Sequence, residues 1–124
     1  MHNCMEVSMR DTLLQCSGML AIVVAMIHGV LTETKVFSRV TIEPVRLRTL
    51  FRLVWQIPTV AWIACGVLLI AAPSMASDTA RHWMVVTFAS LFAFSAFGNA
   101  WGTRGRHFGW MVLSAVAALA VAGY

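Results

Sequence analysis

Residues 13–31 read LLQCSGMLAIVVAMIHGVL, a run of 19 residues that contains no charged side chain. At about 1.5 Å per residue, a helix of this length covers about 28 Å, close to the roughly 30 Å hydrocarbon core of a bilayer. Its strongly polar residues are Gln15 and His28. The segment therefore predicts a helix that spans a membrane.

Three further apolar segments follow, at residues 53–72, 83–101 and 108–124. Together with the first they predict an all-α fold, an integral membrane four-helix bundle of up-down topology that forms a single domain. We expect Pro58 to kink the second span unless a neighbour satisfies the carbonyl that it leaves free. The fourth segment has 17 residues, so we expect it to cross with little tilt.

The composition supports a surface that faces lipid. Sixty per cent of the residues are hydrophobic and 11% are charged, whereas about a quarter of the residues of a soluble domain are charged. The first apolar run is long for the core of a signal peptide, and Thr32 to Lys35 do not form a small-residue cleavage site. We therefore expect the first span to stay in the protein.

Basic residues predict how the bundle is oriented. The long first connector, residues 32–52, holds five of the nine Lys and Arg residues, and the third connector, residues 102–107, holds two more. Connectors rich in Lys and Arg lie on the cytoplasmic side. We expect a multi-pass protein of a bacterial inner membrane with both termini periplasmic. Within the first connector, we expect the second helix to begin near Pro44. The basic residues that give the net charge of +4 are thus explained by the orientation in the membrane, and we expect no nucleic-acid partner.

Small residues recur at four-residue spacing on the third and fourth spans. They are Ser114, Ala118 and Ala122 on the fourth span, and the pairs Ala89 with Ala93 and Ala96 with Ala100 on the third. Small side chains let helices approach closely in lipid. The stripes predict either a tight hairpin between these spans or a homo-oligomer, and the sequence does not distinguish the two.

Three polar side chains fall at one expected membrane depth. His28, Gln56 and Asn99 each lie two or three residues from the cytoplasmic end of a span, which places them within about 5 Å of one depth. Polar groups at such a depth prefer the interior of a bundle. We therefore predict that they share a ligand-binding pocket near the cytoplasmic face.

Charged residues next to these positions are expected to form the rim of the pocket. They are Glu33, Arg52, Arg104, Arg106 and His107. The arginines would suit an anionic lipid headgroup. These residues also have simpler interpretations. His28 would make a structural hydrogen bond, Gln56 and Asn99 would make hydrogen bonds between helices, Glu33 would form an interfacial ion pair beside Lys35, and the arginines would be topology signals.

Three segments together resemble a functionally uncharacterised family of small four-helix bacterial membrane proteins. They are residues 28–33 (HGVLTE), 52–56 (RLVWQ) and 103–110 (TRGRHFGW). The corresponding family patterns are H-x-x-x-G-E, R-x-x-W-H and T-R-G-R-H-x-G-W. This chain departs from them at Thr32, where the family has glycine, and at Gln56, where it has histidine. The resemblance implies a membrane bundle, and the loss of the second histidine weakens a haem or metal site.

No enzyme motif occurs in the sequence, which lacks HExxH, a Walker loop, GxSxG and paired carboxylates within the spans. We therefore expect a non-enzymatic membrane protein without a cofactor or metal. It would act as an accessory subunit of a larger membrane complex or bind a lipid or small ligand. The expected partners are membrane lipids, including anionic headgroups, and further copies or subunits.

Two alternatives remain open at this point. A small oligomeric transporter or channel would need a polar path through the membrane, and the expected midplane carries no charge. A redox protein using His28 would need a second ligand from a partner chain.

The orientation can be tested by cysteine labelling in a background without the native cysteines. Ser38→Cys in the first connector is expected to react only after the inner membrane is permeabilised. Ser77→Cys in the second connector is expected to react in intact cells stripped of their outer membrane. Labelling of position 38 from the periplasm would contradict the orientation.

Overall fold

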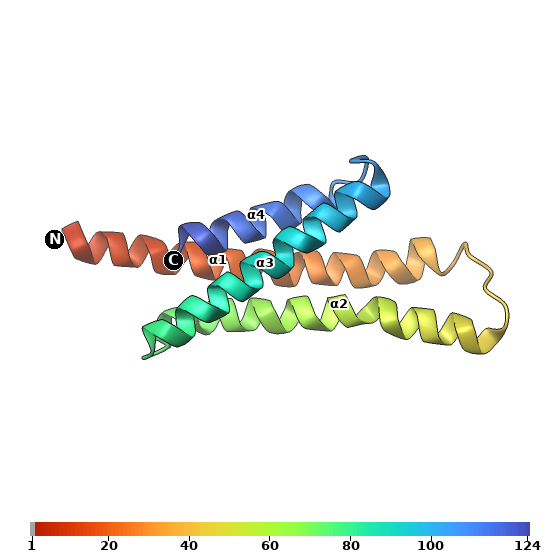
Figure 1. The fold of residues 1–124 in the computed structure, drawn as a ribbon, viewed down its shortest axis with the longest axis horizontal. Helices are drawn as coiled ribbons and strands as arrows, with labels where there is room; N and C mark the ends of the chain where they lie inside the picture. Colours follow the sequence, from red (N-terminus) through yellow and green to blue (C-terminus); the bar gives the residue numbers. More distant parts are fainter. Residues whose placement is uncertain (1) are drawn as a thin grey trace.

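The computed structural model describes residues 2–124, with side chains from Met5 onward. These residues form four α-helices and no strand: α1 (His2–Leu31), α2 (Val45–Ala71), α3 (Asp78–Thr103) and α4 (Gly109–Ala122), as Figure 1 shows. The predicted all-α fold with four helices is confirmed.

Three helical stretches are long and apolar enough to cross a membrane, namely Met5–Val36, Val45–Ser74 and Asp78–Thr103. The first includes a π-helical segment, Thr32–Val36, that continues α1. The apolar helix α4 is shorter than the expected 108–124, because its helical hydrogen bonds end at Gly123. Its 14 residues cover about 21 Å.

The helices do not pack equally against one another. α1 packs along α2 and also against α4, and α3 packs against α4, whereas α2 and α3 make no comparable contact. In Figure 1, α3 lies obliquely across the molecule and moves away from α2 toward its Thr103 end. The bundle is therefore more open between α2 and α3 at that end.

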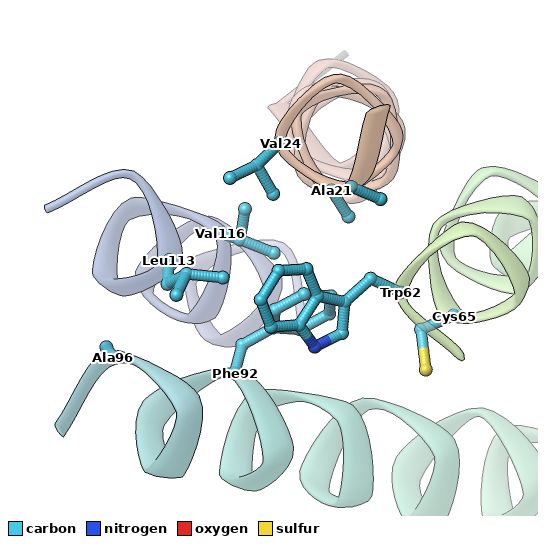
Figure 2. Packing of buried hydrophobic residues seen from close by; sticks show 9 residues of the cluster. Ala21, Val24, Trp62, Cys65, Phe92, Ala96, Leu113 and Val116 are labelled. Carbon is cyan, nitrogen blue, oxygen red and sulfur yellow. The ribbon is translucent and has the colours of Figure 1, made fainter. Parts of the chain in front are cut away.

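The core lies where side chains from all four helices meet around Trp62 of α2. Figure 2 shows the indole of Trp62 directed between the helices, toward Phe92 of α3 and Leu113 of α4. The Trp62 and Phe92 ring centroids are 6.1 Å apart. Ala21 and Val24 complete this cluster from α1. A large aromatic ring at the centre keeps α2 at a distance from α3 and α4.

The backbones of α1 and α2 approach closely at Gly18 and Gly66. A Cβ added to Gly66 would lie 2.7 Å from the carbonyl oxygen of Gly18, and one added to Gly18 would overlap the carbonyl oxygen of Gly66. Only glycine allows backbones to meet in this way. The pair therefore fixes where α1 crosses α2.

The stripe of small residues on α4 does not form the packed face that a tight hairpin with α3 would require. Ser114, Ala118 and Ala122 are exposed. The residues that α4 buries are larger on average: Gly109, Leu113, Val116 and Ala120. On α3, Ala89 and Ala96 are buried as expected for a packed face.

Two prolines act in different ways on α2. Pro44 immediately precedes the helix and accepts a hydrogen bond from the Leu47 amide at 2.9 Å, as its expected place at a helix start requires. Pro58 lies inside the helix, which continues through it to Ala71.

The glycine crossing predicts opposite effects for two alanine substitutions. Gly66→Ala should destabilise the protein by about 1–3 kcal/mol, because the added methyl meets the α1 backbone. Gly98→Ala is the matched control, since a Cβ there meets nothing within 4 Å, and should stabilise by up to about 1 kcal/mol. Unfolding by sodium dodecyl sulfate in mixed micelles, followed by circular dichroism, measures both. Equal stability of the two variants would argue against the crossing.

Candidate functional site

A cavity of about 410 Å³ lies between the helices at the end of the molecule that carries the two basic connectors. All four helices contribute to its wall, which is mostly apolar. Its polar lining residues are His28, Thr32, Lys35, Asn99, Thr103 and His107. Val24, Trp62 and Leu113 line it next to the core. Its size lies within the roughly 300–1,000 Å³ of pockets that hold small molecules.

The His28 ring is held against α2. Its Nε2 lies 3.4 Å from the carbonyl oxygen of Trp55, and its ring centroid lies 5.0 Å from that of Trp62. A carbonyl only accepts hydrogen bonds, so this contact requires the proton on Nε2. In the neutral ring, Nδ1 then remains as an acceptor.

Asn99 faces the cavity from α3. Its side-chain Oδ1 is buried and has no hydrogen-bond partner. Its backbone carbonyl accepts a bond of 2.7 Å from the Thr103 hydroxyl one turn later. Buried amide oxygens without a partner are uncommon, so Asn99 is a polar group whose hydrogen-bonding capacity the fold leaves unused.

His107 lies in the α3–α4 turn and lines the same cavity as His28. Its Nδ1 accepts a hydrogen bond from the Gly109 amide at 3.1 Å. The proton of the neutral ring is therefore on Nε2, and this ring nitrogen is a donor. Gly109 is buried beneath the ring, where an added Cβ would lie 2.8 Å from His107 Nδ1.

The third sequence motif, residues 103–110, builds the turn that carries His107. The Gly105 amide bonds to the Ala100 carbonyl at 2.7 Å, and Arg104 and Gly105 both have positive φ, of 52° and 73°. This is a helix-ending turn in which a glycine relieves backbone strain. The Trp110 indole then donates to the Gly105 carbonyl at 3.2 Å. The motif thus has a structural explanation that needs no bound phosphate.

Gln56 belongs to a separate cluster between α1 and α2. Its Nε2 donates to Glu33 Oε1 at 3.0 Å, and its Oε1 accepts from Thr59 at 2.9 Å. Arg52 pairs with the other oxygen of Glu33 at 2.5 Å. Figure 1 shows the two helices running side by side here. The cluster connects α1 to α2 at the basic end of the bundle.

The structure therefore divides the predicted pocket. His28, Asn99 and His107 line the cavity, while Gln56 turns to the α1–α2 cluster. Successive residues of a helix point about 100° apart, so Gln56 cannot face the same way as its neighbour Trp55, which lines the cavity. The expected depth correctly brought His28 and Asn99 to one cavity, but it was not sufficient to place Gln56.

The predicted rim is also divided. Glu33 forms an ion pair outside the cavity, as in the simpler interpretation, but its partner is Arg52 and not the adjacent Lys35. Arg104 and Arg106 are exposed on the turn and do not line the cavity. A different basic residue, Lys35, does line it.

Sequence reasoning missed several lining residues that helical spacing would have found. Thr32 and Lys35 follow His28 by four and seven residues, and Thr103 follows Asn99 by four. These spacings put side chains on one helical face. A search for polar residues four or seven positions away from His28 and Asn99 would have added Thr32, Lys35 and Thr103 to the predicted site.

This arrangement suits binding of an amphipathic molecule. Apolar walls would hold its body, and a few polar groups would orient it. In the described part of the chain, no three His, Cys, Asp or Glu side chains gather in a way that could hold a metal ion.

Comparison with other proteins found no matching family model, curated protein or solved structure. The resemblance carried by residues 28–33, 52–56 and 103–110 stays a prediction.

Proposed function

We propose that this chain is a non-enzymatic, multi-pass protein of the bacterial inner membrane that binds a lipid or another small amphipathic ligand. The cavity near the basic connectors is the proposed site. The observation that carries the proposal is that all four helices surround one mostly apolar cavity with a few polar side chains.

The outer surface supports a membrane environment for this function. Large apolar side chains are exposed along the helices, among them Phe94 at 77% and Trp101 at 78%. Contiguous apolar surface of this kind is unfavourable in water and suits lipid. In the proposed up-down arrangement, both basic connectors would be cytoplasmic and both termini periplasmic.

The packing of the helices suggests how such a ligand reaches the cavity. α2 and α3 make little contact, and the cavity extends between Trp55 on α2 and Asn99 and Thr103 on α3. A gap between spans faces the bilayer, where amphipathic molecules are concentrated. We infer that the ligand moves into the cavity sideways from the membrane.

A pair of neighbouring substitutions tests the proposed site. Leu31 lines the cavity and is partly buried, whereas Val30 is 57% exposed and lies outside it. Leu31→Trp should fill the cavity and lower the amount of co-purified ligand several-fold, and Val30→Trp should leave it unchanged. Native mass spectrometry of protein extracted in mild detergent measures the bound molecule and its stoichiometry.

Circular dichroism of both variants would verify that each is folded. The proposal would be contradicted if the two folded variants carried the same amount of ligand as the parent, or if the parent carried none.

A further inference from the structure

We propose that the ligand is a single-chain amphiphile with an anionic head, a carboxylate or phosphate, that is held by Lys35 and His107. This inference rests on the proposed function and names the class of molecule that the cavity selects. Four features of the site support it: the charge of Lys35, the donors at the outer end of the cavity, the apolar inner end, and the volume of the cavity.

Lys35 brings a positive charge that the protein itself does not pair. The acidic residue nearest to it in sequence is Glu33, whose carboxylate is already engaged by Arg52 and Gln56. Within the described residues, the ion pairs are Arg52 with Glu33 and Arg81 with Asp78. The ammonium group of Lys35 is therefore available to an anion from outside the chain.

Lys35 and His107 supply the donors at this end of the cavity, while the acceptors His28 Nδ1 and Asn99 Oδ1 lie at least one helical turn deeper. Lys35 has three N–H groups, and His107 presents Nε2–H because its Nδ1 is occupied by the Gly109 amide. The Thr103 hydroxyl hydrogen is already donated to the Asn99 carbonyl. A head rich in acceptors matches such a set, and carboxylate and phosphate oxygens are the strongest acceptors in membrane lipids.

The opposite end of the cavity is apolar. Val24, Trp62 and Leu113 line it there and are 5%, 7% and 2% exposed. From Lys35 to Val24 the distance along the α1 axis is about 16 Å, at about 1.5 Å per helical residue. A hydrocarbon chain with its head at Lys35 would end against the buried core.

The volume favours one chain over two. About 410 Å³ lies near the lower end of the range for pockets that hold drug-sized molecules, roughly 300–1,000 Å³. A diacyl phospholipid would have to leave one chain outside the cavity. Fatty acids and lysophospholipids with an acidic head provide the required single chain and charge.

Competition for a quenching ligand tests the inference on the full chain in an uncharged detergent. The probe is dodecanoate brominated near its methyl end, which quenches tryptophan on contact, and Trp55 and Trp62 line the cavity. We expect saturable quenching that unlabelled dodecanoate and a lysophosphatidate reverse. Dodecanol, which has the same chain without the charge, should compete roughly tenfold more weakly.

Two substitutions in the first connector test which basic side chain binds the anionic head. Lys35→Gln should weaken dodecanoate binding roughly tenfold and leave dodecanol binding unchanged, because it removes the cation and not the apolar wall. Arg39→Gln, the matched control, changes an exposed residue outside the cavity and should alter neither. The relative strength of the carboxylate and phosphate competitors then identifies the head.

Several results would overturn the inference. Equal competition by dodecanoate and dodecanol, or equal effects of Lys35→Gln and Arg39→Gln, would leave a cavity that binds amphiphiles without reading charge. Competition by diacyl phosphatidylglycerol alone would exclude a single-chain ligand. Quenching that no amphiphile saturates or reverses would contradict the proposed function as well.

Discussion

The contact between the backbones of α1 and α2 at Gly18 and Gly66 is the constraint on which the rest of the structure depends. Because neither residue has a side chain, the carbonyl oxygen of each glycine lies in the space that a Cβ on the other would occupy. The close approach continues at the other end of the pair, where a Cβ on Gly29 would lie 3.1 Å from the methyl group of Thr59. The α1–α2 pair is thereby closed along its length, and Gln56 and Glu33 connect it at the basic end.

A closed α1–α2 pair leaves the space in the bundle on the side of α3 and α4. Trp62 points into that space and keeps α2 away from α3, while α4 packs against both α1 and α3 (Figure 2). The cavity follows from this unequal packing. Three elements bring His28, Asn99 and His107 to its wall. His28 is held by its contact with the Trp55 carbonyl of α2, and His107 by its hydrogen bond with the Gly109 amide.

Much of the fold could be predicted from the sequence, because uncharged apolar runs of about 20 residues have few alternatives to helices. The distance of each polar residue from the end of its apolar segment could also be counted, which is why His28 and Asn99 were predicted to lie near one another. The direction of a side chain around its helix was harder, since one residue of offset turns it by about 100°. Gln56 therefore takes the simpler of its two predicted roles, a hydrogen bond between helices, and does not line the cavity. The stripe of Ser114, Ala118 and Ala122 is exposed, which leaves the predicted homo-oligomer as its open interpretation.

The turn after α3 shows a second reason why sequence alone falls short. Its glycines, His107 and Trp110 have the composition of a phosphate site, yet their hydrogen bonds close the turn on itself. The same residue types serve local backbone bonds and ligands equally well, and only the geometry separates the two uses.

Photo-crosslinking tests most directly the central claim that the cavity lined by all four helices is the binding site. A dodecanoate with a diazirine at its methyl end, bound to the parent protein in nanodiscs and activated by light, should attach to peptides that contain Val24, Trp62 or Leu113. These residues line the apolar end of the cavity. Attachment confined to the exposed face of α3 around Phe94 and Trp101 would contradict the account, because it would show only contact with the outer surface.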